Sequence, residues 1–237
     1  MTSHNVSVQE VARFDALAAE WWDPAGPMRP LHRMNPARID WITARIARHF
    51  GPDARPAILD VGCGAGLAAE ALARAGFPVT AIDAAADVIA IARDHAADMG
   101  DAAPTYRVAM TEDLLAEGLR FPVISALEVI EHVPDPAAFV ASLRGLLAPG
   151  GLLVMSTLNR TNRSWLTAKL GAEYVLRWLP VGTHDWNAFL PPAELGVMLR
   201  QAGLRVTETA GLEMNLITGA WTTGRDLRIN YLMAATG

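Results

Sequence analysis

The chain of 237 residues is long enough for one large α/β domain with its own core. Hydrophobic residues make up 51% of the sequence and charged residues 19%, a balance that argues against intrinsic disorder. The net charge of -5 argues against broad nucleic-acid binding, and the single cysteine, Cys63, excludes an intrachain disulfide and suits a reducing cytoplasm.

Residues 1–50 are expected to form a helical extension of a single domain that spans residues 1–237. Apolar residues within 14–21 recur at helical spacing, which predicts an amphipathic first helix. The Pro- and Gly-rich stretch 23–27 is expected to end that helix. Asn35-Pro36 is typical of a helix start, with asparagine as the cap, and predicts a second helix that runs to about residue 50.

From residue 57 onward, short apolar runs alternate with helical patterns. This alternation predicts an α/β fold with a doubly wound, mainly parallel sheet and helices on both faces. A ligand of such a fold binds beyond the carboxyl ends of the strands. The predicted strands are 57–61, 78–82, 106–108, 123–127 and 152–156, and the predicted helices include 67–75, 87–97 and 136–147.

A glycine-rich loop with Gly62, Gly64 and Gly66 follows the first predicted strand. Three alternate glycines let the backbone turn tightly and approach a ligand closely, and the next helix directs free N–H groups toward it. A dinucleotide-binding loop would place its third glycine at Leu67, so the spacing disfavours a pyrophosphate ligand. Asp83 ends the next strand, where its carboxylate can accept hydrogen bonds from both hydroxyls of a ribose.

Further segments along the chain form a distinctive combination. They are FDALA at 14–18 with WWD at 21–23, PLHRMNPAR at 30–38, EVIEHVPDP at 128–136, STLNRT at 156–161 with SW at 164–165, and GTHDW at 182–186. Together with the glycine loop, this combination resembles the class I S-adenosylmethionine-dependent methyltransferases. More narrowly, it resembles the ubiquinone biosynthesis O-methyltransferases of bacteria and mitochondria. The resemblance covers almost the whole chain.

The resemblance implies a Rossmann-like fold with a seven-stranded sheet and S-adenosylmethionine as the cofactor. It also implies a cofactor site that includes Arg38, Gly62, Asp83 and Leu127. The Arg38 guanidinium would pair with the carboxylate of the cofactor's methionine half. Leu127 would form an apolar wall against the cofactor, or simply pack in the core.

The adenine side of the expected site is less well defined. Glu112 and Asp113 follow the third predicted strand, and Glu112 is the candidate to receive the adenine amino group. Both acids would equally suit the N-terminus of a helix, where negative charge interacts favourably with the dipole. Pro122 and Met110 stand where related enzymes often carry acidic residues, so this chain departs from the family pattern here.

The resemblance implies phenolic acceptors, namely a 2-polyprenyl-6-hydroxyphenol and a 3-demethylubiquinol. A phenol has a pKa near 10, so it is a poor nucleophile until it loses its proton. His132, just past the fourth strand, is a candidate general base. Alternatively, Glu128, Glu131 and His132 could together bind a divalent ion, Mg²⁺ or Zn²⁺, that activates the hydroxyl, and the resemblance implies a metal in some members.

Residues 158–190 are expected to form an apolar insertion. Within it, 164–180 has helical spacing, with Lys169, Glu173 and Arg177 in one narrow charged stripe. We expect this helix to cover the active site and to dip into a membrane surface that holds the acceptor. A dimer interface or a helix buried in the core are the alternatives.

Location and rival functions follow from the same features. The sequence shows no signal-peptide pattern and no apolar run of ~20 residues that would span a bilayer, so we expect a cytoplasmic protein on the inner face of the membrane. Other enzymes of ubiquinone biosynthesis are candidate partners. The rivals are a methyltransferase with another aromatic or lipid acceptor, a nicotinamide-dependent dehydrogenase, and a non-enzymatic cofactor-binding subunit.

Overall fold

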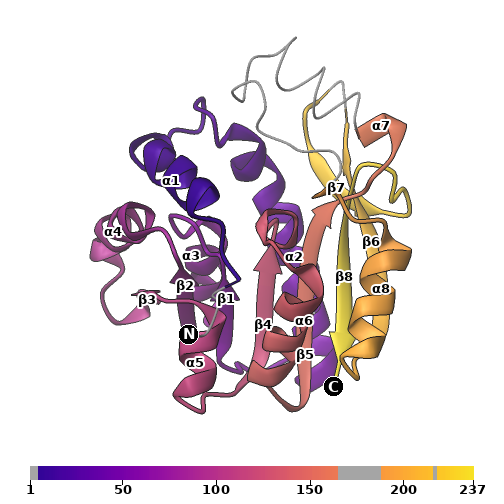
Figure 1. Cartoon of the computed structure of the whole chain (residues 1–237). Coiled ribbons are helices and arrows are strands. Elements are labelled where there is room, and N and C mark those ends of the chain that lie inside the picture. Colours follow the sequence, from indigo (N-terminus) through magenta and orange to yellow (C-terminus); the bar gives the residue numbers. More distant parts are fainter. Residues whose placement is uncertain (1–4, 165–187, 216–217) are drawn as a thin grey trace.

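The computed structural model describes residues 5–164, 188–215 and 218–237. The strands of these residues are β1 Ile58–Val61, β2 Val79–Asp83, β3 Thr105–Val108, β4 Phe121–Leu127, β5 Leu147–Leu158, β6 Arg205–Met214, β7 Trp221–Gly224 and β8 Asn230–Thr236. They form one sheet of eight strands in the order β3-β2-β1-β4-β5-β8-β6-β7 (Figure 1). The five strands β1 to β5 are parallel, whereas β8 runs antiparallel to both of its neighbours, β5 and β6. The predicted doubly wound fold is confirmed.

Helices cover both faces of this sheet (Figure 1). The helices are α1 Val8–Leu17, α2 Arg29–Phe50, α3 Leu67–Arg74, α4 Ala86–His95, α5 Thr111–Ala116, α6 Pro136–Leu146, α7 Asn162–Ser164 and α8 Pro192–Gln201, with 3₁₀ turns at Ala18–Glu20, Ala97–Ala102 and Ile130–His132. Side chains of α2, α3 and α4 pack in one buried cluster and those of α5, α6 and α8 in another. The sheet lies between these two clusters.

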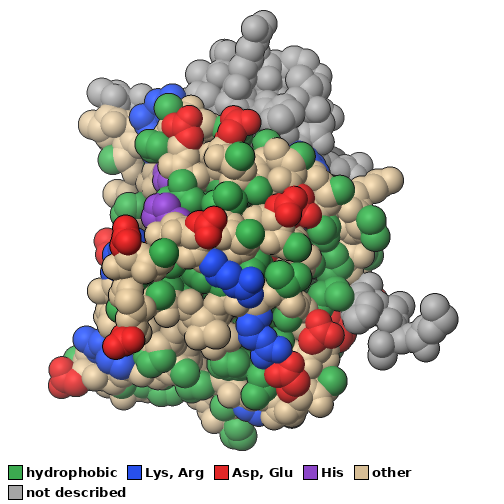
Figure 2. Space-filling model, turned by 90° about the vertical axis from the view of Figure 1, so that its left-hand side faces the viewer, with side chains coloured by type: hydrophobic (Ala, Val, Ile, Leu, Met, Phe, Trp, Pro, Cys, Tyr) green, Lys and Arg blue, Asp and Glu red, His purple; other side chains and the backbone are tan. Residues whose placement is uncertain are grey.

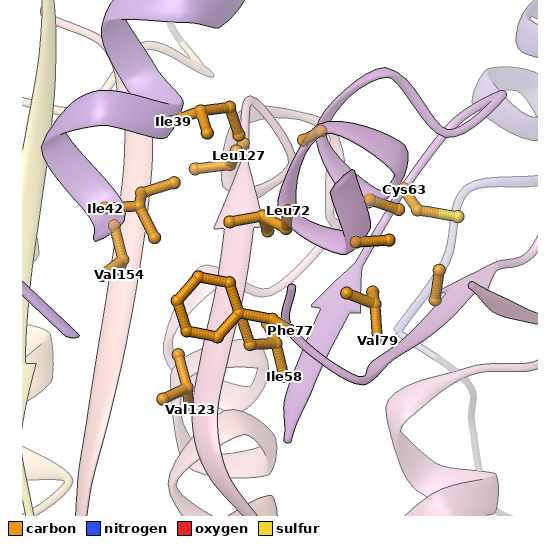
Figure 3. Close-up of a cluster of buried hydrophobic side chains, with 14 of the residues drawn as sticks. Ile39, Ile42, Ile58, Cys63, Leu72, Phe77, Val79, Val123, Leu127 and Val154 are labelled. Atoms are coloured by element: carbon orange, nitrogen blue, oxygen red, sulfur yellow. The ribbon is translucent and has the colours of Figure 1, made fainter. Parts of the chain in front are cut away.

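Alternate residues of the central strands point into the two clusters. In β1, Ile58 joins the cluster of α2 and α3, whereas its neighbour Leu59 joins that of α6. Val123 and Ile124 of β4 divide in the same way. Because a strand with both faces buried needs apolar side chains at most of its positions, these strands appear in the sequence as mainly apolar runs. Figure 3 shows the first cluster, in which Phe77 and Leu72 lie between the sheet and the helices.

The second helix begins earlier than the sequence suggested. Helix α2 starts at Arg29 with Pro30 in its first turn, and Pro36 lies inside it. The prediction that Asn35 caps the helix is therefore wrong. Asn35 is instead buried, and its side-chain amide donates to the carbonyl oxygen of Leu67 at 2.8 Å. The asparagine that the local pattern assigned to a helix cap thus makes a tertiary contact instead.

The sheet has one strand more than the seven that the family resemblance implied. The additional strand is β7, which forms an antiparallel hairpin with β6 at the edge of the sheet. On the side of the molecule that carries α4 and β3, acidic and basic side chains are interspersed among apolar ones (Figure 2). Most of the expected apolar insertion, residues 165–187, lies outside the described residues.

Candidate active site

The glycine loop joins β1 to α3 and is crowded by side chains from elsewhere in the chain. Gly64 and Gly66 have φ values of 54° and 93°, in the left-handed region that favours glycine. A Cβ on Gly64 would lie 2.2 Å from Cζ2 of Trp21, and one on Gly66 would lie 2.1 Å from the Tyr106 hydroxyl. Both positions therefore require glycine, for backbone conformation and for space.

Asp83 faces this loop from the end of the neighbouring strand β2. Its Oδ2 accepts a hydrogen bond of 2.9 Å from the Gly64 N–H, and its Oδ1 accepts one of 2.9 Å from the Ala85 N–H. Burial raises the pKa of Asp83, and these backbone hydrogen bonds oppose that effect. A carboxylate has about four acceptor sites, so each oxygen can still accept a hydrogen bond from a ligand hydroxyl.

Arg38 and Asp60 place opposite charges near the same end of the sheet, and each has an atom without a partner. Arg38 is 3% exposed and donates to Oδ1 of Asn35 at 3.1 Å, but its Nε has no hydrogen-bond partner. Asp60 is 2% exposed; its Oδ1 accepts from the Ser125 hydroxyl at 2.7 Å and its Oδ2 has no partner. Because buried polar atoms rarely remain unpaired, this pair indicates a ligand with both a positive and a negative group.

A cavity of about 550 Å³ brings the predicted residues together. All of the residues predicted from the sequence to form the site line it, except Gly66, which instead precedes the first turn of α3. Those that line it are Arg38, Gly62, Gly64, Asp83, Glu112, Leu127, Glu128, Glu131 and His132. Glu112 also lies in the first turn of α5, so the two interpretations of that residue are compatible.

The three residues Glu128, Glu131 and His132 follow β4 and already have protein partners. Glu128 has a φ of 57°, a strained conformation for a residue other than glycine, and accepts hydrogen bonds from Ser156 at 2.7 Å and Asn230 at 3.1 Å. Glu131 is buried and accepts from the Thr157 hydroxyl at 2.9 Å. Burial and the charge of Glu128 raise the pKa of Glu131 to about 7.

His132 is paired with a residue of the N-terminal helix. Its Nδ1 lies 2.7 Å from Oε2 of Glu10. Burial lowers the pKa of His132, but the interaction with Glu10 and the charges of Glu131 and Glu10 outweigh burial, so that this pKa is raised overall. A histidine held by a carboxylate at one ring nitrogen can exchange a proton at the other.

The predicted metal set does not fit an ion in this arrangement. Within the described parts of the chain, no group of three or more histidine, cysteine, aspartate or glutamate side chains is disposed to hold one. The side chains of Glu128, Glu131 and His132 are directed to Ser156, Thr157 and Glu10 respectively. The metal site stays a prediction from the sequence, and no step of the chemistry below depends on it.

Sequence reasoning missed two acidic residues of the cavity to which the site's chemistry is assigned below, Asp60 and Glu10. Asp60 was a detectable signal, because a charged residue inside the apolar run 57–61 must find a partner or a ligand. Glu10 offered no such signal, since it is an ordinary acidic residue on an amphipathic helix. Only the fold brings it to His132.

Comparison with known proteins gives matches to methyltransferases. A family model described as a methyltransferase domain matches residues 13–209. Among solved structures, the magnesium protoporphyrin IX methyltransferase of Synechocystis with bound S-adenosylmethionine is similar with a TM-score of 0.66, at 16% identity over 99% of both chains. The plantazolicin methyltransferase gives a TM-score of 0.64, at 15% identity over 96% of both chains. At these identities the likeness shows the fold alone.

Relatives of much higher identity extend over nearly the whole chain. The ubiquinone biosynthesis O-methyltransferase of Methylobacterium nodulans is 47% identical over 99% of this chain and 96% of its own length. That of Dinoroseobacter shibae is 46% identical over 98% of this chain and 97% of its own. These likenesses set aside the nicotinamide-dependent dehydrogenase that the loop spacing already disfavoured. The chain belongs to the family of ubiquinone biosynthesis O-methyltransferases.

Proposed function

We propose that this protein methylates a phenolic hydroxyl of a polyprenylated ring, with a 2-polyprenyl-6-hydroxyphenol and a 3-demethylubiquinol as its acceptors. As a member of its family, the chain is an S-adenosylmethionine-dependent O-methyltransferase. The observation that carries the proposal is one cavity that is lined by His132 and by Arg38 and Asp60, each of which has one buried polar atom without a partner. Direct group transfer requires that the donor and the acceptor bind side by side in one cavity.

The residues present fit the cofactor. The methionine half of S-adenosylmethionine carries a carboxylate and an ammonium group, which complement the free Nε of Arg38 and the free Oδ2 of Asp60. The remaining acceptor sites of Asp83 suit the ribose hydroxyls, and Gly62 and Gly64 line the same cavity beside Asp83. When bound, S-adenosylmethionine supplies an electrophilic methyl group.

His132 is assigned as the base that takes the proton of the acceptor hydroxyl. The phenolic oxygen forms a bond to the methyl carbon as the carbon–sulfur bond breaks, and the products are an aryl methyl ether and a neutral thioether. The phenolic proton passes to the free ring nitrogen of His132 and then to solvent. Apolar side chains from α2 and the β6–β7 hairpin, among them Met34, Met214 and Trp221, line the cavity and would contact the ring and its prenyl chain.

Donor binding is expected to weaken as the pH falls through about 6. Burial raises the pKa of Asp60 to about 6; the Ser125 hydrogen bond and the charge of Arg38 oppose this effect, and the charge of Asp83 adds to it. An ammonium group pairs only with the ionised carboxylate. The affinity for the donor therefore has its full value above that pH and decreases by up to about tenfold per pH unit below it.

Calorimetric titration of S-adenosylhomocysteine between about pH 7.5 and about pH 5 measures this dependence. Asp60→Asn serves as the comparison: we expect weaker binding at neutral pH and a flatter pH profile, which retains only the contribution of other groups such as Asp83. A wild-type affinity that stays constant across this range would contradict the assignment of Asp60.

Membrane association is part of the proposal. No helix among the described residues is long and apolar enough to cross a bilayer. A polyprenylated acceptor resides in the membrane, so we propose that the protein meets it at the inner surface through residues 164–180. Other enzymes of ubiquinone biosynthesis are proposed partners in the same place.

A methyl-transfer assay tests the acceptor class directly. We expect the protein to convert short-chain prenyl catechols to their monomethyl ethers, identified by mass spectrometry, and to act more slowly on catechol without a prenyl chain. Equal rates on both would favour another small aromatic acceptor, and no product from any catechol would favour a non-enzymatic cofactor-binding subunit.

The same assay examines the metal prediction. It is repeated with a chelator and again after Mg²⁺ or Zn²⁺ is restored. A loss of activity that the ion reverses would support a site at Glu128, Glu131 and His132, whereas an unchanged rate would remove the ion from the mechanism.

A further inference from the structure

The partner of His132 comes from the N-terminal helix and not from the turn after β4 that carries His132 itself. Oε2 of Glu10 lies 2.7 Å from Nδ1 of His132. Phe14, one turn further along α1, meets the same imidazole edge-on, with ring centroids 5.2 Å apart and planes at 87°. Helix α1 thus contacts His132 through two side chains on one face.

Helix α1 is also a wall of the cavity. Val11, Phe14 and Leu17 of this helix line the cavity, and Trp21 just beyond it lies against the glycine loop. A ligand in the cavity therefore has α1 on one side and the carboxyl ends of the strands on the other.

Two hydrogen-bonded contacts hold α1 in place, and neither involves His132. Before the helix, Asn5 exchanges hydrogen bonds with the backbone of Asp135, at 2.6 and 2.8 Å. At its other end, Oδ1 of Asp15 accepts from the backbone N–H groups of Asp87 and Val88 at the start of α4. The docking of α1 can therefore be perturbed separately from the Glu10 contact.

We propose that Glu10 is a positioning residue that fixes the tautomer and the orientation of the His132 ring. A neutral imidazole has one N–H donor and one acceptor nitrogen, and a carboxylate beside Nδ1 favours the tautomer with the proton there. Nε2 then keeps the lone pair that the acceptor chemistry needs. The inference rests on the proposed function, in which His132 serves the phenolic oxygen.

The approach of Glu10 to His132 is close but not well aligned, since Oε2 makes no hydrogen bond of good geometry. Catalytic hydrogen bonds often align only when ligands are bound. Because Glu10 belongs to the wall that encloses the cavity, the ring is positioned only while α1 covers the site. Enclosure of the ligands and activation of the acceptor are then coupled.

Glu10→Gln is the test, and Asp15→Asn is its matched control. Both substitutions turn a carboxylate of α1 into an amide of nearly equal size. We expect Glu10→Gln to lower kcat by about 10- to 100-fold, the size of effect that loss of a carboxylate partner has at metal-ligating histidines, while the KM for the donor changes less than about twofold. Asp15→Asn keeps an oxygen that can accept from Asp87 and Val88, so its kcat should stay near that of the wild type.

Nitrogen NMR of the histidine rings provides a readout independent of turnover. In protein with ¹⁵N-labelled histidine, above the pKa of His132, we expect Nδ1 to carry the proton in the wild type and a mixture of tautomers in Glu10→Gln, with the His132 signals assigned through His132→Gln. This result would support the inference even if no tested phenol were methylated. An unchanged tautomer in Glu10→Gln, or an equal loss of kcat in Asp15→Asn, would overturn it.

Discussion

Replacing Asp83 with alanine is expected to weaken S-adenosylhomocysteine binding about a hundredfold. A hydrogen bond to a charged group contributes about 1.5–3 kcal/mol, and two ribose hydroxyls at the lower value give about 3 kcal/mol. Since about 1.4 kcal/mol corresponds to tenfold in affinity, the expected change is easily measured by calorimetry. The substitution also removes the acceptors of the Gly64 and Ala85 N–H groups, so the loop itself becomes less ordered.

Two further variants make this result specific. Asp83→Asn retains a side-chain oxygen that can accept one of the two backbone hydrogen bonds, and we expect a smaller loss of affinity. Asp94→Ala removes an exposed aspartate of the neighbouring helix α4 and should leave binding unchanged. If Asp83→Ala folds and binds the nucleoside as tightly as the wild type, the donor site assigned to the tips of β1 and β2 is wrong.

The donor half of the site was largely predictable because its determinants are local. Gly62, Gly64 and Asp83 lie at the ends of two strands that appear in the sequence as apolar runs, and adjacent parallel strands bring their carboxyl ends together. The spacing of the glycines alone disfavoured a dinucleotide loop. Arg38 was a candidate only through the family resemblance, because a helix pattern does not say which arginine will be buried.

Non-local contacts explain what local patterns missed. Asn35-Pro36 has the form of a helix start, yet the helix starts at Arg29, and the side chain of Asn35 donates a hydrogen bond to Leu67 in another element and caps no helix. Strand β7 is a short edge strand that forms a hairpin with the preceding strand β6, and it carries too few residues for a clear alternation. The contact of Asn35 lies outside the window in which a sequence pattern is recognised, whereas β7 lies inside it and is missed because it is short.

The acceptor half shows the same limit in functional terms. The sequence predicted His132 as a site residue from its position after the fourth strand, but it did not predict which residues surround it. The structure surrounds it with Glu10 from α1 and Glu131 from its own turn, while Phe14 contacts its ring edge-on. A residue whose ionisation depends on such neighbours has a role that composition and spacing do not specify.

His132→Ala is expected to lower kcat by about a hundredfold to ten-thousandfold, the range typical for the loss of a general acid or base. Donor affinity should remain within about twofold, because the proposed donor contacts lie at Arg38, Asp60 and Asp83. His49→Ala is the matched control: that imidazole lies at the end of α2, where it contacts the carbonyl oxygen of Gly150, and it does not line the cavity.

The acidity of the acceptor separates proton transfer from a merely structural role. A phenol with electron-withdrawing substituents loses its proton more readily and needs a base less, so the ratio of wild-type to His132→Ala rates should shrink as the phenol pKa falls from near 10. A defect of the same size on all phenols would instead indicate that the imidazole only shapes the cavity. Full methyl transfer by His132→Ala, with and without a chelator, would remove this residue from the mechanism altogether, and with it the reason for Glu10 to lie beside it.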